Sequence, residues 1–379
     1  MYIYKLGNIT DKKEALKTLG VESGGISIMA KKMELFYFFI KDLKTPAANI
    51  LKQDALSIGA DLAVPGGVIL CEKPAYDCIL IGSRKHMEIL SKKELAQPFG
   101  LKALAVELKK FLFLNTFPLQ IMGVINANDD SFFEGSRFVA EDAIIQCERM
   151  IEEGASIIDI GAVSSRPGAD AVSVNEELER MKPVCDMIYA EKLYEKATFS
   201  VDSYTPDVVE YALNRGFTMI NDITGASNDD IIKLAVKHEA KLCIMHMQGT
   251  PQTMQEDPVY DDVMVEVSEF FEERIAKCEK LGLDRENIIL DVGIGFGKTL
   301  EHNITLIKNL AHFKHFGCKI LLGASRKSMI DKISPSVTAE RLPGTLAIHL
   351  KAVENGANII RCHDVAEHKQ VFAVLNELN

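Results

Sequence analysis

The sequence lacks the features that mark a membrane-spanning, secreted or disulfide-braced protein. No apolar run approaches the length of a membrane span, and the longest runs, such as Leu35–Ile40, suit buried strands. Residues 1–5 do not combine a charged start with a long apolar core, so we expect no signal peptide. The eight cysteines are scattered, without a CxxC pair, which favours reduced thiols in a cytoplasmic protein over a disulfide frame or a zinc site.

An excess of basic residues is also missing. The chain has 43 lysines and arginines against 54 aspartates and glutamates, and its net charge is −11. Because binding to a phosphate backbone needs a basic surface, nucleic acid is not expected as a main partner. Small anions are not excluded, since one local cluster of arginine and lysine can hold them.

Residues 1–115 predict a small α/β unit without a cluster of reactive side chains. The apolar pattern predicts strands at Ile26–Ala30, Leu35–Ile40 and Asp77–Ile81, and helices at Thr45–Gly59 and Leu101–Phe113. The role of this N-terminal extension is unknown: a scaffold, an oligomer contact and a lid stay open.

Residues 116–379 predict a second domain, in which short apolar runs alternate with amphipathic helical stretches. The eight runs are Leu119–Asn126, Ser156–Gly161, Thr198–Asp202, Met219–Ile223, Lys241–His246, Asn287–Gly293, Lys319–Ser325 and Asn358–Asp364. Near-continuous apolar strands separated by helices indicate a parallel sheet covered on both faces. Eight such units in about 260 residues favour a (β/α)8 TIM barrel, with an open doubly wound sheet as the alternative.

The loop after the sixth run contains three alternate glycines. It reads Asp291-Val-Gly-Ile-Gly-Phe-Gly-Lys298, and glycine permits φ > 0 and close approach of a ligand to the main chain. A Walker A loop would need glycine at Val292, and the dinucleotide-binding fingerprint lacks its third glycine at the required offset. We therefore expect a strand-to-helix turn that presents the Asp291 carboxylate.

Polar residues follow the apolar part of every barrel run, which is where the active site of such a barrel lies. Asp202, Asn221 and Asp291 form a donor and acceptor set suited to the edge of a flat, amide-like heterocycle. His246 also lies at a strand end, where it is as suited to brace the barrel as to act.

A second group of strand-end residues suits an anion. Arg361 and His363 follow the eighth run, and barrels frequently bind phosphate at the loops after strands seven and eight. Ser165 belongs to the same set. Asn126 and the carboxylates near it suit Mg²⁺, which prefers oxygen ligands and keeps several waters.

Motifs along the second domain, taken in order, resemble those of dihydropteroate synthase. They are Ile121–Asn126, Asp130–Phe132, Ser164–Gly168, Val201–Asp202, Ile220–Ile223, Met245–Gln248, Asp291–Lys298, Ser325–Lys327 and Arg361–Asp364. The resemblance covers about residues 117–379 and leaves the N-terminal extension outside it.

The resemblance implies a transferase of folate biosynthesis. The family joins 6-hydroxymethyl-7,8-dihydropterin diphosphate to 4-aminobenzoate, with Mg²⁺, and yields 7,8-dihydropteroate and diphosphate. Carried over by position, the pterin ligands are Asp202, Asn221, Asp291 and Lys327. The diphosphate ligands are Asn126 with Mg²⁺, Ser165, Arg361 and His363. The 4-aminobenzoate contacts are Phe132, Pro167, Phe296, Lys327 and Ser328. A homodimer and inhibition by sulfonamides are implied as well.

The implied reaction is a dissociative substitution at the pterin methylene. Mg²⁺, Arg361 and His363 would stabilise the departing diphosphate. The catalytic residues implied are Asp130, which supports the pterin cation, Arg166, which meets Asp130 when two loops close and exclude water, and Lys327. Because an arylamine is already a nucleophile, no general base is assigned.

Two positions depart from the family pattern. The family usually has Thr-Pro where this chain has Asn128-Asp129, and Glu where it has Val163. Without the proline the first loop gains freedom before closure. A methyltetrahydrofolate:corrinoid methyltransferase and a catalytically impaired pterin-binding protein are the alternatives, and neither release of diphosphate nor turnover of 4-aminobenzoate is expected of them.

Overall fold

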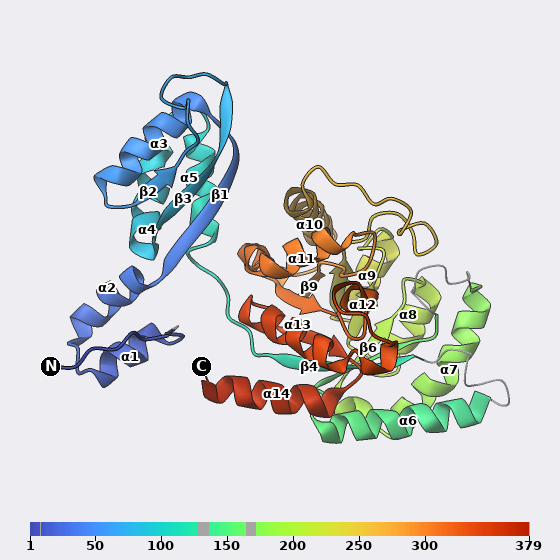
Figure 1. Cartoon of the computed structure of the whole chain (residues 1–379). Helices are drawn as coiled ribbons and strands as arrows, with labels where there is room; N and C mark the ends of the chain where they lie inside the picture. The colour runs from blue at the N-terminus through green and yellow to red at the C-terminus, as the bar shows by residue number, and fades with distance from the viewer. Residues whose placement is uncertain (8, 127–135, 164–171, 379) are drawn as a thin grey trace. The chain divides into compact units, whose positions relative to one another are not determined.

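The structure is a computed structural model that describes residues 1–7, 9–126, 136–163 and 172–378, with residues 136–139 described by their backbone alone. Residues 1–114 and residues 115–376 form two compact units (Figure 1). In these described ranges no helix is long and apolar enough to cross a membrane. All eight cysteines are free thiols, and only Cys71 is exposed.

The N-terminal unit is a three-stranded antiparallel sheet with helices. Its elements are α1 Lys12–Thr18, α2 Ser23–Met33, β1 Leu35–Lys44, α3 Thr45–Ser57, β2 Asp61–Ala63, β3 Ala75–Ser83, α4 Arg84–Lys93 and α5 Leu101–Lys110. The strand order is β1-β3-β2. Side chains alternate along β3, so Cys78 and Leu80 are buried in a core shared with Leu51 of α3 and Leu90 of α4.

The strand expected at Ile26–Ala30 is wrong, because this segment lies in α2. Its inward-facing residues are Ile26, Ala30 and Met33, which follow helical i, i+4, i+7 spacing, whereas Ile28 and Met29 are exposed. A short apolar run fits both periods, and only the packed neighbours decide between them.

The second unit is a closed barrel of eight parallel strands, which confirms the predicted fold class. The strands are β4 Gln120–Asn126, β5 Ile157–Gly161, β6 Thr198–Asp202, β7 Met219–Asp222, β8 Lys241–Met245, β9 Ile288–Asp291, β10 Lys319–Leu322 and β11 Ile359–Cys362. Each strand pairs with the strands before and after it in the chain, and β11 pairs with β4 to close the ring. The open-sheet alternative is thereby excluded.

Helices surround the barrel and return the chain between strands (Figure 1). They are α6 Ser136–Glu153, α7 Val174–Ala190, α8 Pro206–Leu213, α9 Asp229–Lys237, α10 Val263–Lys280, α11 Leu300–Lys308, α12 Ser328–Ile333, α13 Leu342–Glu354 and α14 Val365–Leu378. Their starts follow local chemistry. Pro206 opens α8, and the Asp262 carboxylate caps α10 by accepting from the N–H of Met264 at 2.9 Å.

The interior of the barrel is filled by apolar side chains in one layer. Its members are Met122, Ile157, Met219, Cys243, Ile289, Leu321 and Ile359. Because alternate residues of a strand face the same side, the residue two positions further along each strand faces the same interior, nearer the carboxyl ends. On β5, β7, β9 and β11 those residues are Asp159, Asn221, Asp291 and Arg361. A polar layer therefore lies directly on the apolar one.

Candidate active site

A buried ion cluster occupies this polar layer. The Arg361 guanidinium donates from Nε to Asp159 Oδ2 at 2.7 Å and from Nη2 to Asp202 Oδ2 at 2.7 Å. Asn221 Nδ2 donates to the same Asp159 oxygen at 2.9 Å. Four strands, β5, β6, β7 and β11, thus contribute to one hydrogen-bonded network.

The cluster contains more negative than positive charge. Burial, followed by repulsion from Asp159, raises the pKa of Asp202 to about 7, and Arg361 opposes this shift. Burial lowers the pKa of Arg361, but the Asp159 and Asp202 carboxylates outweigh it, so the pKa lies above its ordinary value. Asp159 Oδ1 is buried and has no hydrogen-bond partner in the part of the chain that the structure describes. Such an oxygen can accept an N–H from a ligand.

Asp291 lies in the same layer, at the end of β9 and the start of the glycine loop. Its Oδ1 accepts from the N–H of Gly293 at 2.8 Å. Burial raises the pKa of Asp291, while Lys327 opposes the shift and Arg361 adds a smaller opposing effect. The charges of Lys327 and Arg361 therefore favour the ionised form of this carboxylate.

The glycine loop needs glycine for conformation and for space. The φ angles of Gly293, Gly295 and Gly297 are +67°, +82° and +57°, a region that costs other residues energy. A Cβ on Gly293 would lie 2.0 Å from the carbonyl oxygen of His246. The expected strand-to-helix turn is present, and it packs main chain against main chain.

A buried lysine fastens the far end of this loop. Lys298 is 2% exposed, and its ammonium contacts His246 Nδ1 at 2.9 Å and the carbonyl oxygens of His246 and Phe296 at 3.1 and 2.9 Å. Burial lowers the pKa of Lys298 to about 7, and burial together with Lys298 lowers the pKa of His246 to about 3. His246 therefore accepts a hydrogen bond as a neutral ring and braces the loop.

Lys327 closes the site from the side of β10. Its ammonium donates to the carbonyl oxygen of Ile294 and lies 4.4 Å from the centre of the Phe296 ring. Burial lowers the pKa of Lys327 to about 8, and Asp291 opposes this shift. One ammonium thus borders the carboxylate layer and an aromatic face. Ser328, the next residue, is exposed at the first position of α12.

The structure describes some of the residues that were predicted to bind the diphosphate. His363 Nδ1 lies 2.9 Å from Ser325 Oγ, so the ends of β10 and β11 are joined by a side-chain hydrogen bond. Asn126 is exposed at the end of β4. Five predicted residues, Asp130, Phe132, Ser165, Arg166 and Pro167, lie outside the described residues. So do Asn128-Asp129, whereas Val163 is half-buried after β5.

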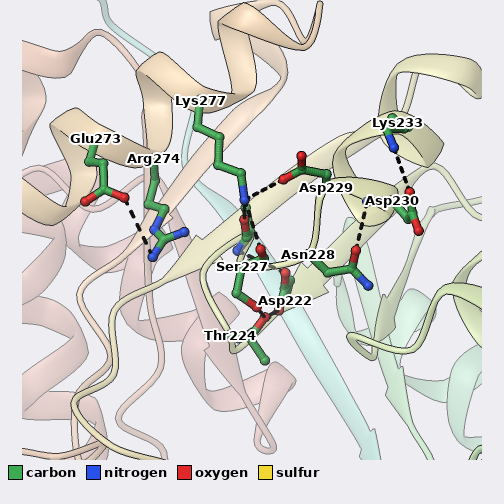
Figure 2. Close-up of polar contacts among 11 residues, drawn as sticks. Asp222, Thr224, Ser227, Asn228, Asp229, Asp230, Lys233, Glu273, Arg274 and Lys277 are labelled. Atoms are coloured by element: carbon green, nitrogen blue, oxygen red, sulfur yellow. Dashed lines mark hydrogen bonds and ion pairs between the residues drawn. The ribbon is translucent and has the colours of Figure 1, made fainter.

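Asp222, the residue after Asn221, holds the turn that follows β7. Figure 2 shows the Asp222 carboxylate held inside the turn after β7, where it accepts from the N–H and the hydroxyl of Thr224 at 2.7 and 2.6 Å. Lys277 of α10 donates to the carbonyl oxygens of Ala226 and Ser227, both at 2.9 Å. The turn is therefore tied to a neighbouring helix, and the strand end that carries Asn221 is fixed.

The structure thus brings Asp202, Asn221, Asp291, Lys327 and Arg361 together at one end of the barrel. Two further buried residues at this end of the barrel, Asp159 and Lys298, were not predicted as site residues. Asp159 interrupts the apolar run Ile157–Gly161, and one carboxylate inside a buried strand is a signal that the sequence did offer. Lys298 ends the motif Asp291–Lys298, but nothing in the sequence indicated that its ammonium is buried, because lysine is usually a surface residue.

Whether these residues suit Mg²⁺ follows from their donor chemistry. Among the described residues no group of three His, Cys, Asp or Glu side chains could hold a metal ion. Asn126 offers an exposed amide oxygen, and Mg²⁺ takes oxygen ligands, keeps several waters and commonly binds together with substrate phosphates. Asn126 is therefore the described residue that would hold Mg²⁺ if the ion binds together with a diphosphate.

Comparison with known proteins identifies the family. The family model described as "Pterin binding enzyme" matches residues 122–363. A bifunctional dihydropteroate synthase/dihydropteroate reductase of Helicobacter pylori is 41% identical over 369 residues, which are 97% of this chain and 96% of that protein. The chain belongs to the dihydropteroate synthase family.

Further members of the family agree. The dihydropteroate synthase of Escherichia coli is 44% identical over 256 residues, 67% of this chain and 90% of the relative. The Yersinia pestis dihydropteroate synthase, solved as a sulfonamide drug complex, superposes with a TM-score of 0.64 at 35% identity and covers 70% of this chain and 99% of its own. The chain is therefore an enzyme of folate biosynthesis, a transferase that makes dihydropteroate. The resemblance drawn from the sequence is confirmed, and the methyltransferase and pterin-binding alternatives are not favoured.

Proposed function

We propose that the polar layer of the barrel binds the pterin ring of the diphosphate substrate. The observation that carries this proposal is the convergence of Asp202, Asn221 and Asp291 beside Arg361. A reduced pterin is flat and presents ring N–H and amino donors along one edge, which carboxylate and amide oxygens accept. Lys327 lies across this layer and offers a donor to the carbonyl side of the ring. The orphaned Asp159 Oδ1 adds a further acceptor beneath it.

The diphosphate lies on the β4, β10 and β11 side of the mouth in this proposal. Asn126 ends β4 and His363 follows β11, and the family resemblance adds Ser165 to this set. Arg361 uses Nε and Nη2 for Asp159 and Asp202, and its Nη1 makes no hydrogen bond to the described residues. The Nη1 donor is therefore the part of Arg361 that the leaving group would meet. Mg²⁺ bound at Asn126 would neutralise charge on the diphosphate.

The chemistry proposed is a substitution at the pterin methylene in which the carbon–oxygen bond to diphosphate breaks ahead of carbon–nitrogen bond formation. Preorganised donors at the departing anion lower the barrier, and each ~1.4 kcal/mol is worth a factor of ten in rate. The 4-aminobenzoate ring would lie against Phe296, with Lys327 and Ser328 beside it. The family resemblance assigns Phe132 and Pro167 to the same substrate, and Asp130 and Arg166 to catalysis.

A coupled assay tests this assignment. Supplied with the pterin diphosphate, 4-aminobenzoate and Mg²⁺, the protein should release one diphosphate for each dihydropteroate formed, and omission of 4-aminobenzoate should abolish product. Tight pterin binding without release of diphosphate would instead support a pterin-binding protein. Removal of Mg²⁺ with a chelator should slow release and weaken binding of the diphosphate substrate, and leave the affinity for the bare pterin unchanged.

A second activity, reduction of dihydropteroate, is proposed for the whole chain. The H. pylori relative that matches 97% of this chain carries a dihydropteroate reductase in its name, whereas the E. coli synthase matches 67%. The N-terminal unit, residues 1–114, lies outside the family match at 122–363. In the reduction, a hydride and a proton add across a carbon–nitrogen double bond of the dihydropterin ring, and a reduced nicotinamide or reduced flavin is oxidised.

Mass spectrometry separates the two activities. The full chain, given dihydropteroate and each class of hydride donor in turn, should convert the substrate to a product heavier by two hydrogens. If no donor gives that product while the synthase assay succeeds, the second activity is refuted and the first is untouched.

A homodimer in the cytoplasm is proposed from the family resemblance and from the reduced cysteines. Light scattering on the purified chain should give twice the 42.0 kDa chain mass. A monomer at micromolar concentration would refute this proposal.

A further inference from the structure

Two fully buried histidines connect the loops that follow β10 and β11. His349 of α13 and His368 of α14 are both 0% exposed. The N–H of Ala324 donates to His349 Nε2 at 3.0 Å, His349 Nδ1 lies 2.7 Å from His368 Nε2, and His368 Nδ1 lies 2.5 Å from the carbonyl oxygen of Asp364. This chain of contacts runs from one strand-end loop to the other.

The groups at the two ends of this series of hydrogen bonds determine which ring nitrogen of each histidine carries the proton. The Ala324 amide can only donate, so His349 Nε2 accepts and His349 carries its proton on Nδ1. That proton is donated to His368 Nε2. The proton of His368 is then on Nδ1 and is donated to the Asp364 carbonyl, which can only accept. All three hydrogen bonds exist together only when both rings are neutral, because a further proton on either Nε2 would face another donor.

The segment held at the Ala324 end is the turn that presents Lys327. Arg326 in this turn has φ of +56°, a conformation that is unfavourable for a side chain larger than glycine. Its N–H donates to Thr345 Oγ1 at 2.9 Å, and its carbonyl oxygen accepts from Arg341 Nη1 at 3.2 Å. Its guanidinium meets the Asp364 carboxylate at 2.5 and 3.1 Å. Strain of this kind persists only where the surroundings hold it.

Asp364 takes part in both the histidine hydrogen bonds and the ion pair with Arg326. Its carbonyl oxygen ends the histidine chain, and its carboxylate grips Arg326, one residue before Lys327. Displacement of either histidine would release the Ala324 amide or shift Asp364, and both changes move the same turn.

We propose that His349 and His368 are positioning residues for Lys327, acting through the Ala324–Lys327 turn. They touch neither substrate in this proposal. The inference rests on the proposed role of Lys327, and its test includes a readout that does not depend on catalysis.

The charged groups around the pair favour the neutral rings. Burial is the largest cause that lowers the pKa of His349 well below its ordinary value, followed by the neighbouring His368, Lys327 and His363. Burial also lowers the pKa of His368, although Asp364 and Glu367 oppose the shift. In the unfolded chain these histidines bind protons below about pH 6.5, whereas in the folded chain both rings stay neutral. The contribution of the pair to the free energy of unfolding is therefore complete above about pH 6.5 and is lost as the pH falls below it.

Amide hydrogen exchange on the full chain tests the link directly. His349→Leu removes the acceptor of the Ala324 N–H, and we expect the exchange of that amide to rise about tenfold, the worth of one buried hydrogen bond. In the same variant kcat/KM for 4-aminobenzoate should fall about tenfold. His349→Gln keeps an acceptor oxygen, so both values should return to near those of the unmodified chain.

Val353→Ala is the matched control, since Val353 lies on the same helix, four residues beyond His349, and is half-buried against the apolar core. It should lower thermal stability and leave Ala324 exchange and kcat/KM unchanged. If His349→Leu preserves both values, or if Val353→Ala alters them equally, the proposal is overturned. Altered exchange with unchanged kinetics would overturn only the role of Lys327.

The pH dependence gives an independent check. Below pH 6.5 the ratio of unfolding constants between the unmodified chain and His349→Gln should change by up to about tenfold per pH unit, because glutamine does not titrate. Parallel curves for the two proteins would show that His349 is not held neutral in the fold.

Discussion

Asp159 and Asp202 place two carboxylates around the single guanidinium of Arg361 at the mouth of the barrel. The sequence predicts Arg361 as a ligand of the diphosphate, but its best-defined partners are these carboxylates. Removal of Arg361 would leave two buried carboxylates unpaired and would disturb pterin binding and stability together. Lys327 is a clearer probe of single-residue function, because it makes no ion pair within the described structure.

Replacement of Lys327 by alanine is expected to lower kcat/KM for both substrates by about 10- to 100-fold, the value of a hydrogen bond to a charged group. The reason is that the ammonium borders Asp291 on one side and the Phe296 ring on the other. Steady-state kinetics with each substrate varied in turn measure this. Lys332→Ala, which removes an exposed lysine of the helix α12 that follows Lys327, is the control. A loss confined to one substrate would contradict the shared placement.

Asp202 should make pterin binding depend on pH. Burial raises its pKa to about 7, and the ionised form is the one that accepts N–H groups from the pterin. Affinity for the bare pterin should therefore weaken as the pH falls below about 7, by up to about tenfold per unit once the group is protonated. Calorimetric titration between pH 5.5 and 8.5, roughly spanning this range, measures it. Asp202→Asn should bind weakly at every pH, and an unchanged pH profile in that variant would exclude Asp202 as the titrating group.

At the scale of secondary-structure elements, the loop from β9 to α11 has a conformation that requires particular residues. Its three glycines adopt positive φ, and two of them lie against main-chain oxygens of the segment after β8. Lys298 fastens the loop to His246 from beneath. Consequently the same contacts fix the position of the loop that carries Phe296 and of the strand that carries Asp291.

The variant Gly293→Ala should be strongly destabilised and should lose pterin affinity. It combines the cost of positive φ, ~1–2 kcal/mol, with that of a Cβ overlapping the His246 carbonyl oxygen, ~1–3 kcal/mol. Gly282→Ala is the matched control, because Gly282 has φ of +96° and its Cβ would meet nothing closer than 3.8 Å. Urea unfolding gives the loss in the free energy of unfolding for each variant, and the difference between the two losses is the cost of the overlap. Equal losses would show that the close approach is not needed.

At the scale of the whole molecule, the role of the barrel unit follows from more observations than the role of the N-terminal unit. The barrel unit carries the polar layer, the family match and the likeness to solved synthases. The N-terminal unit carries its own apolar core around Leu51, Leu80 and Leu90. It extends the match to the bifunctional H. pylori relative.

Sulfonamides are expected to inhibit the synthase by competing with 4-aminobenzoate, because they carry a similar ring and an anionic end. The family member from Y. pestis was solved with a sulfonamide drug. Initial rates at several concentrations of both compounds should show KM for 4-aminobenzoate rising with an unchanged limiting rate. A benzenesulfonamide without the para-amino group is the control. Purely noncompetitive inhibition would place the drug outside the proposed pocket.

The sequence by itself determined the eight barrel strands and placed Asp202, Asn221, Asp291 and Arg361 at or near strand ends, because apolar runs and strand ends are local properties of the chain. It could not determine the segment Ile26–Ala30, where a short apolar run fits both a strand and a helix until neighbours pack on it.

Only the tertiary structure decided which polar groups meet. The Arg361 guanidinium reaches Asp159 and Asp202, which lie 202 and 159 positions away in the chain, because β11 closes the ring beside β4. The chain from Ala324 through His349 and His368 to Asp364 likewise depends on two helices packing beside one strand end. A pattern along the chain records which side chains are available, whereas their hydrogen bonds and charges depend on distances that exist only after the barrel has closed.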